Sequence, residues 1–240
     1  MVLDLEFVMN KQENIARGFR LLEDAKYVYD TLIPLAINHN RWNIVVFESY
    51  RASELLVKGI ICASGYEHKD THELHSLVSR YCNILEKNKG NMSFISSINT
   101  PDGNRYFLRF VGTHMELIKC IAGSYTILGS TNTYNPYIAP VLKRDGSCIS
   151  IHQGEKRLLF TVDSAVIGDY SYKIVIPNPP PEDRIAVLNE LVEALLKTRT
   201  ESFYSVREFF EPEAKLVIEN LHSVFRLSKL FEITDRVLNT

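Results

Sequence analysis

Hydrophobic side chains recur at helical spacing through the first half of the chain. In residues 42–63 they fall at i, i+3 and i+4 intervals, and neither proline nor glycine occurs before Gly59. The positions are Trp42, Val45, Val46, Ala52, Leu56, Ile60 and Ala63. This period is typical of an amphipathic helix with one buried face. We therefore predict a long helix over residues 42–63, around which the other elements are organised.

Two further helices flank this one in the sequence. Residues 12–33 carry a second apolar stripe, and Pro34 should kink or end that helix because proline removes one backbone hydrogen bond. Gly65 is placed to stop the long helix, and Thr71 is a suitable N-cap for a third helix over about 74–89. The polar turns between the helices are short, so neighbouring helices should pack antiparallel.

The next segments predict a loop and a fourth helix. Residues 91–103 are rich in Ser, Asn, Gly and Pro, which is typical of a loop. Residues 104–128 are apolar enough for a buried helix, although Gly112 and Gly123 interrupt it. A helix at this place would close a four-helix bundle.

Beyond residue 130 the pattern changes to short strands and then back to helices. Residues 130–140 predict a linker, and turn signals then separate short β-branched or aromatic runs. We expect three or four antiparallel strands, three of them near residues 148–152, 157–163 and 171–176. Three helices should follow, over residues 182–197, over residues 201–210 and from Pro212 onward.

The predicted fold class is therefore α+β and mainly α. An antiparallel four-helix bundle in residues 1–130 precedes residues 140–240, which hold a small antiparallel sheet, a β-meander, and the C-terminal helices. The second part either forms its own domain or packs on the bundle as one unit.

Composition narrows the classes of partner. With 27 Lys and Arg residues against 29 Asp and Glu residues, the chain has no global basic surface, so a nucleic acid would have to meet a local patch. The four cysteines form no CxxC pair, which favours reduced, buried thiols over a zinc knuckle or a disulfide framework. An acidic N-terminus and the lack of an apolar run of about 18 residues favour a cytoplasmic protein with no membrane span.

One set of residues in the first half forms a recognisable pattern. It consists of an aromatic-rich helix entry, an Ala-x-Glu with a Lys four residues after the Glu, a Gly exit, and a Thr-His-x-Leu start to the next helix. The residues are Trp42, Phe47, Ala52, Glu54, Lys58, Gly65, Thr71, His72 and Leu74. This pattern resembles the HEPN family (higher eukaryotes and prokaryotes nucleotide-binding domain) over roughly residues 12–128.

The HEPN resemblance implies a candidate catalytic pair. Many HEPN proteins carry an Arg-x4-6-His motif near the fourth helix, and here Arg109 and His114 stand at that position. The resemblance implies a metal-independent ribonuclease in which two protomers face each other across one cleft. His114 would act as general acid or base on the ribose 2′-hydroxyl, and Arg109 would stabilise the charged phosphorane.

A structural interpretation of the same pair stays open. Phe110 is apolar where family members usually have a polar residue, and Glu116 stands where a tyrosine is often found. In this alternative, Arg109 pairs with a local acid and His114 is a hydrogen-bonded, partly buried histidine. The spacing alone does not decide between the two interpretations, because it also arises by chance in a chain of this composition.

The long helix and the segment after it supply candidate nucleotide-binding residues. Glu54, Lys58 and His72 either line a nucleotide pocket or form ion pairs that brace the seam between two helices. His72 and His75 are spaced to share a metal, but no third ligand at suitable spacing accompanies them. We therefore expect no metal site and no cofactor.

Two functional hypotheses follow. In the first, the chain is a HEPN ribonuclease that acts as a homodimer on RNA in defence or stress, as in toxin-antitoxin systems. In the second, it is a catalytically silent module that dimerises or binds a nucleotide, and its partner is a nucleotidyltransferase or another effector.

Overall fold

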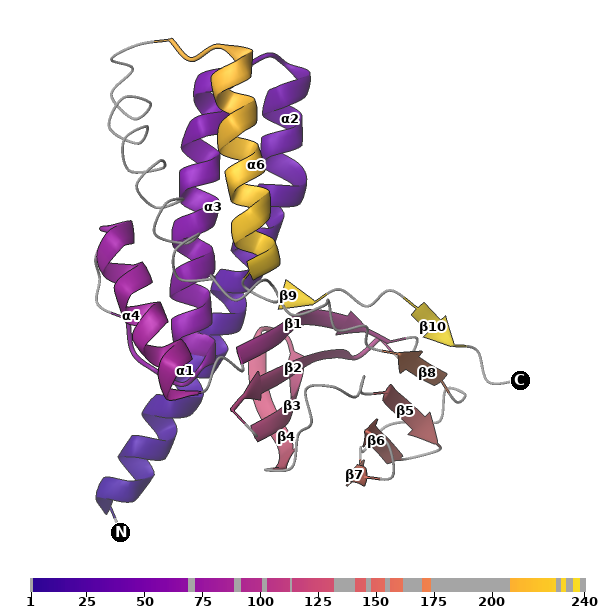
Figure 1. The fold of residues 1–240 in the computed structure, drawn as a ribbon. Coiled ribbons are helices and arrows are strands. Elements are labelled where there is room, and N and C mark those ends of the chain that lie inside the picture. The colour runs from indigo at the N-terminus through magenta and orange to yellow at the C-terminus, as the bar shows by residue number, and fades with distance from the viewer. Residues whose placement is uncertain are drawn as a thin grey trace. The chain divides into compact units, whose positions relative to one another are not determined.

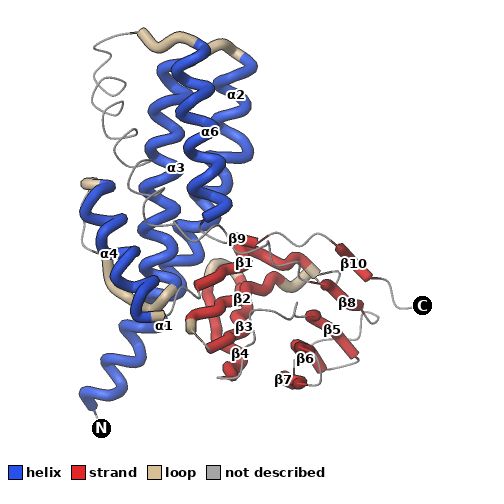
Figure 2. The backbone as a smooth tube through the Cα atoms, viewed as in Figure 1, coloured by secondary structure: helices blue, strands red, loops and turns tan. Residues whose placement is uncertain are grey.

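The computed structural model divides the chain into two compact units. It describes residues 2–68, 72–88, 92–100, 103–112, 114–131, 141–145, 148–153, 156–161, 170–173, 208–227, 230–231 and 235–237. One unit comprises Met1–Lys87 and Pro179–Ser228, and the other comprises Asn88–Asn178 and Lys229–Thr240. The first unit is helical and the second is built of strands, so the chain is α+β as predicted (Figures 1 and 2).

The first predicted helix is longer than its apolar stripe. It begins as α1 (Val2–Tyr27), passes through one π-helical segment, η1 (Val28–Leu32), and continues as α2 (Ile33–Asn38). Pro34 lies in the first turn of α2, and the Ile33 N–H donates to the carbonyl of Val28. The wider π turn makes room for the proline ring ahead of it, because the ring would otherwise meet the carbonyl four residues earlier. Pro34 therefore interrupts the α-helical hydrogen bonds without ending the helix.

The long helix predicted over residues 42–63 is confirmed. It is α3 (Trp42–Ala63), and all but one residue of its predicted stripe is buried. Gly18 allows α1 to pack closely on it, since a Cβ at Gly18 would lie 2.1 Å from the backbone nitrogen of Ala63. The next helix, α4 (Leu74–Lys87), is also confirmed. Its predicted N-cap, Thr71, lies outside the described residues.

The helix predicted from Pro212 completes the helical unit. It is α6 (Glu211–Leu227), and it lies alongside α3 (Figures 1 and 2). The Phe209 N–H donates to Asn43 Oδ1 over 2.8 Å, which joins the start of α6 to the start of α3. The ring of Phe225 stacks on Tyr29 of η1 with centroids 4.4 Å apart. Because α3 and α6 start at the same end of the unit, they run in the same direction.

The predicted fourth helix at residues 104–128 is wrong, and so is the loop at residues 91–103. The chain forms four strands there: β1 (Met92–Asn99), β2 (Arg105–Val111), β3 (His114–Ile121) and β4 (Ser124–Thr131). Gly112 and Gly123 have φ angles of 63° and 80°, which suit tight turns between antiparallel strands. The four-helix bundle of residues 1–130 is therefore not formed as predicted.

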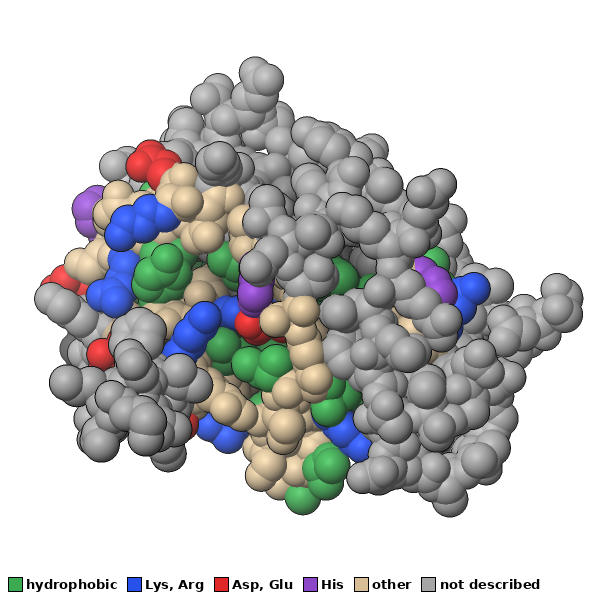
Figure 3. All heavy atoms as spheres, turned by 90° about the horizontal axis from the view of Figure 1, so that it is seen from below, with side chains coloured by type: hydrophobic (Ala, Val, Ile, Leu, Met, Phe, Trp, Pro, Cys, Tyr) green, Lys and Arg blue, Asp and Glu red, His purple; other side chains and the backbone are tan. Residues whose placement is uncertain are grey.

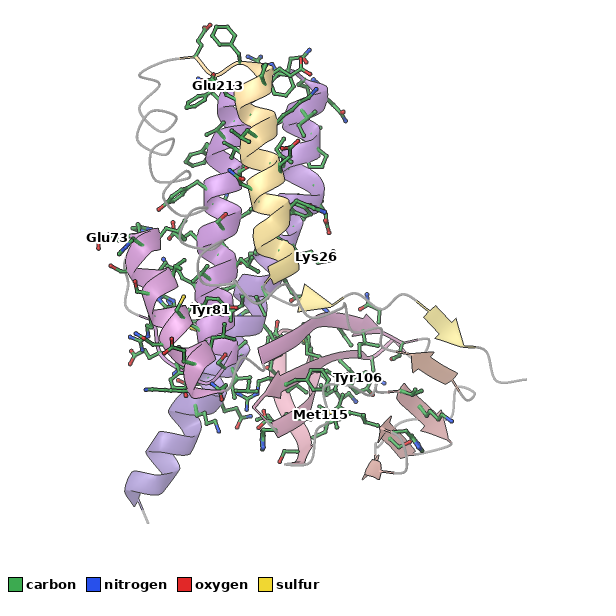
Figure 4. All side chains as sticks on the ribbon, viewed as in Figure 1. Lys26, Glu73, Tyr81, Tyr106, Met115 and Glu213 are labelled. Carbon is green, nitrogen blue, oxygen red and sulfur yellow. The ribbon has the colours of Figure 1, made fainter. Side chains whose placement is uncertain are left out.

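These strands belong to a sheet of order β4-β3-β2-β1-β9, in which β9 (Leu230–Phe231) pairs parallel to β1 and the other pairs are antiparallel. The middle of β2 is buried over five consecutive residues, as expected for a strand covered on both faces. Tyr106 and Met115, from β2 and β3, lie within this sheet (Figure 4).

The second sheet matches the strands predicted beyond residue 140. Its order is β10-β8-β5-β6-β7, and its pairs are antiparallel. The strands are β5 (Val141–Asp145), β6 (Cys148–Gln153), β7 (Lys156–Thr161), β8 (Tyr170–Lys173) and β10 (Asp235–Val237).

Some sequence predictions fall beyond the described residues. The helix predicted over residues 182–197 lies outside them, as does most of the one over residues 201–210, of which residues 208–210 are described and are not helical. The division into domains 1–130 and 140–240 stays a prediction. Among the described helices, none is both long and apolar enough to cross a bilayer.

Candidate functional site

One face of α3 carries a series of side chains that line a pocket in the helical unit. Phe47, Arg51, Glu54, Leu55 and Lys58 recur at intervals of three or four residues, so they share one side of the helix. At about 1.5 Å per residue this series extends over roughly 16 Å. The other side of α3 is the buried stripe, so the fold turns this polar face toward the pocket.

The pocket has a volume of about 440 Å³, which lies in the range of small-molecule sites. α1 adds Arg17 and Leu21, α3 also adds Tyr50, and the segment between α3 and α4 adds His68 and His72. Because Gly18 brings α1 against the end of α3, the neighbouring Arg17 is held at the pocket. All of these residues belong to the helical unit.

Glu54 is the centre of the polar contacts. Its Oε1 accepts from Lys58 Nζ over 2.7 Å and lies 2.8 Å from His72 Nδ1. Burial raises the pKa of Glu54, but the hydrogen bonds and charges of Lys58 and His72 outweigh it and hold the pKa below the ordinary value. Glu54 is therefore an ionised carboxylate at neutral pH. The three predicted nucleotide-binding residues do come together in space.

His72 is held at the mouth of the pocket by two contacts. Its side chain is 75% exposed, whereas that of Glu54 is 14% exposed. The Tyr50 hydroxyl donates to the backbone carbonyl of His72 over 2.8 Å. These contacts fix both the backbone and the ring of a residue that otherwise faces solvent.

The pocket carries an excess of positive charge. Among the described residues that line it, Arg17, Arg51 and Lys58 are cations and Glu54 is the single acid. Arg51 pairs more loosely with Glu48, at 3.5 Å, and both Arg17 and Arg51 are solvent-exposed. Such a site favours an anionic ligand, and the side chains of Leu21, Phe47 and Leu55 give it an apolar wall.

The candidate catalytic pair lies in the other unit, on the β2–β3 hairpin. Arg109 Nη2 lies 2.6 Å from Glu116 Oε2, and His114 Nε2 lies 2.7 Å from Glu116 Oε1. The side chains of Arg109 and Glu116 are 3% and 6% exposed, and that of His114 is 32% exposed. Arg109 thus pairs with a local acid and His114 is hydrogen-bonded and partly buried, as in the structural interpretation above.

The charge of Glu116 follows from these neighbours. Burial raises the pKa of Glu116, and the Arg109 charge and the hydrogen bonds from Arg109 and His114 lower it further than burial raises it. The carboxylate is therefore ionised and holds both basic side chains.

Figure 3 shows one face of the molecule on which acidic, basic and histidine side chains lie next to hydrophobic ones.

Some residues that line the pocket were predicted from the sequence, and others were not. Glu54 and Lys58 are recognisable from their spacing, but Arg17, Tyr50 and His68 reach the pocket only through the packing of α1 on α3 and the path of the following segment. No group of three or more His, Cys, Asp or Glu side chains suited to a metal occurs in the part of the chain that the structure describes.

Comparison with known protein families matches part of the chain. The family model of the HEPN domain matches residues 19–121, a range that begins in α1 and ends in β3. The resemblance based on the α3 pattern is thereby confirmed. No curated protein and no solved structure matches the chain.

Proposed function

On the premise that residues 19–121 carry a HEPN domain, we propose that the chain is a binding module that holds a nucleotide in the pocket on α3. The observation that carries this proposal is the charge of the pocket: three cations and one carboxylate surround a space of about 440 Å³. A ligand with a phosphate group and an apolar, planar group fits both the cations and the apolar wall.

Each part of a nucleotide has a matching group in the pocket. Guanidinium groups such as those of Arg17 and Arg51 bind phosphate oxygens through two parallel hydrogen bonds. Phe47 offers an aromatic surface on which a base can stack. Glu54, Lys58 and His72 line the same pocket and complete the proposed set of nucleotide-binding residues.

Binding of a radiolabelled or fluorescent nucleotide tests the proposal. Arg51→Ala should weaken binding at least about tenfold, because it removes a charge-assisted contact of about 1.5–3 kcal/mol. Arg20→Ala is the matched control, since Arg20 is an exposed arginine of α1 outside the pocket lining. If the wild-type protein binds no nucleotide at millimolar concentration, or if both variants behave alike, the proposal is wrong.

A second candidate function is a metal-independent ribonuclease that acts as a homodimer through Arg109 and His114. It is supported by the β2–β3 hairpin, which brings the two side chains to one carboxylate. For this activity Arg109 would have to leave Glu116 to reach a phosphate. RNA cleavage that is lost in His114→Ala would support this function.

The biological setting follows from the HEPN assignment and stays a proposal. A role in defence as part of a toxin-antitoxin pair, a nucleotidyltransferase partner and a cytoplasmic location fit either function. Co-purification with a neighbouring gene product and size measurement of the native protein test the partner and the homodimer.

A further inference from the structure

Glu54 uses its two carboxylate oxygens differently. Oε1 accepts from Lys58 Nζ over 2.7 Å and lies 2.8 Å from His72 Nδ1. Within the part of the chain that the structure describes, neither a hydrogen bond nor an ion pair reaches the second oxygen, Oε2. The Glu54 side chain lines the pocket and keeps 14% of its surface exposed. Oε2 is therefore available to a ligand in the pocket.

The charge of Glu54 limits what a ligand can place beside Oε2. Although burial raises the pKa of Glu54, the hydrogen bonds and charges of Lys58 and His72 hold it below the ordinary value, so the carboxylate is ionised at neutral pH. An ionised carboxylate only accepts hydrogen bonds. A phosphate group beside Oε2 would be repelled, and an apolar group would leave the charge without a partner. The ligand must therefore present a hydrogen-bond donor at this point.

Glu54 lies between an aromatic end and a cationic end of the pocket. Phe47 precedes it by seven residues on the same face of α3, which is about 10 Å along the helix axis. Arg17 of α1 lies at the other end. The adjacent Gly18 packs against Ala63, nine residues after Glu54. The order along α3 is thus an aromatic ring, a carboxylate and a cation.

A nucleotide has its parts in the same order, because the ribose joins the base to the phosphate. With the base on Phe47 and the phosphate at Arg17, the ribose lies beside Glu54. Its two hydroxyls are hydrogen-bond donors, and an acidic side chain binds a ribose hydroxyl in the same way in dinucleotide-binding folds.

We propose that Glu54 Oε2 accepts hydrogen bonds from the 2′- and 3′-hydroxyls of the ligand, and that this contact makes the pocket selective for ribonucleotides over deoxyribonucleotides. The inference rests on the proposed binding of a nucleotide at the same site, and it names the sugar that the site selects. Glu54 is the residue that determines this specificity.

The ribose is a better partner for Oε2 than the base is. Amino and ring N–H groups of a base are also donors. A base stacked on Phe47, however, is separated from Glu54 by the turn of α3 that carries Arg51. The sugar is the nearer part of the ligand.

The contacts of Oε1 prepare Oε2 for this role. The Lys58 side chain is 9% exposed and holds Oε1 together with His72. The Tyr50 hydroxyl in turn holds the backbone carbonyl of His72 over 2.8 Å. The carboxylate is thereby oriented before a ligand arrives, so little conformational entropy is lost when a hydroxyl binds.

The test compares ribonucleotides with their dideoxy counterparts in the full-length protein. The probes are the 5′-monophosphates of adenosine, cytidine, guanosine and uridine and of their 2′,3′-dideoxy analogues, and calorimetry measures each Kd. For the nucleotide that binds best, the ribose form should bind at least about tenfold more tightly than the dideoxy form, because the latter lacks the hydrogen bonds to a charged acceptor. The 2′-deoxy and 3′-deoxy forms should fall between the two.

Glu54→Gln distinguishes recognition of the sugar from a structural role. The amide oxygen of the variant accepts from Lys58, so its NH2 group replaces Oε2 and no longer accepts from a hydroxyl. The preference for ribose should fall below about threefold, while the dideoxy form should bind as well as before or more tightly, because a negative charge has left the pocket. A merely structural defect would weaken binding of both forms and keep their ratio. Glu54→Asp, which keeps the charge but shortens the side chain, is a second variant and should also reduce the preference.

Glu48→Gln is the matched control. Glu48 is another acid of α3 with a side chain that is 13% exposed, and it pairs with Arg51 and is not among the residues that line the pocket. Its replacement should change the Kd of the ribose and dideoxy forms by the same factor and leave the preference for ribose intact.

The outcomes distinguish the inference from the function on which it rests. If the wild-type protein binds none of these nucleotides at millimolar concentration, the proposed nucleotide binding is wrong and the inference is overturned with it. If the ribose and dideoxy forms bind equally well, or if both Glu54 variants keep the wild-type preference, the inference is overturned and nucleotide binding stands.

Discussion

Glu54 of α3 and His72, which precedes α4, meet at 2.8 Å between Oε1 and Nδ1 although they are 18 residues apart in the sequence. The contact joins the residue two positions before α4 to the face of α3 that lines the pocket. Because the mostly buried Glu54 carboxylate is ionised in this contact, the stability of the folded protein should depend on its charge.

The stabilisation that Glu54 provides should depend on pH. The pKa of Glu54 is lower in the folded protein than its ordinary value of 4.5, so the ionised carboxylate stabilises the fold above about pH 4.5 and stops doing so as the pH falls through the folded-state value. Glu54→Gln should therefore be less stable than wild type at pH 7, and the difference should shrink in acid. Urea unfolding at several pH values measures it, and a difference that grows in acid would contradict the prediction.

Removing one partner of the buried Arg109–Glu116 ion pair should lower the free energy of unfolding more than replacing both partners with apolar residues. Arg109→Met leaves the Glu116 carboxylate buried beside His114 alone, and we expect a loss of about 3–5 kcal/mol in the free energy of unfolding. The double variant with Glu116→Leu as well should recover much of that loss, since no charge is then left uncompensated. Equal losses in the single and double variants would show that the pair is not coupled.

Gly18→Ala should destabilise the helical unit although alanine favours helices. The added Cβ would lie 2.1 Å from the backbone nitrogen of Ala63, so α1 and α3 would have to move apart. Overpacking of this kind costs about 1–3 kcal/mol or more, against a propensity gain of about 1 kcal/mol. Thermal unfolding measures the net effect. Ala16→Gly, two residues earlier in the same helix, is the control and should cost only the propensity difference.

The hydrogen bond between Phe209 and Asn43 should fix the start of α6. Asn43→Ala removes the acceptor of the Phe209 N–H, and we expect a cost of about 1–2 kcal/mol because that N–H belongs to a mostly buried residue. Hydrogen exchange should become faster at Phe209 and in the first turn of α6, whereas exchange in β2 should not change. Uniform acceleration over the whole chain would argue against a local role.

The sequence predicted α3 well because its hydrophobic positions keep a helical period over many turns. It failed for β2 and β3 for a physical reason. The apolar residues of β2 and β3 do not alternate with polar ones, because their buried stretches are interrupted only by the paired charges Arg109 and Glu116, and a stretch of this kind resembles a buried helix. Gly112 and Gly123 were the informative residues, since their positive φ angles make the turns that separate the strands.

The contacts of the site were predictable from the sequence where both residues lie on one helix. Glu54 and Lys58 are four residues apart, and a spacing of this kind places two side chains together whatever the rest of the fold is. Arg17 approaches the same pocket from a helix whose register on α3 depends on a glycine contact, and no local pattern indicates that contact.

The position of α6 has a consequence for synthesis of the chain. The helix that lies along α3 follows β1 to β8 in the sequence, so the amino-terminal helices are synthesised well before one of their packing partners. The surface of α3 that α6 covers therefore lacks this cover until residues 211–227 have been synthesised. A chain truncated before residue 211 would lack α6 and its packing on α3.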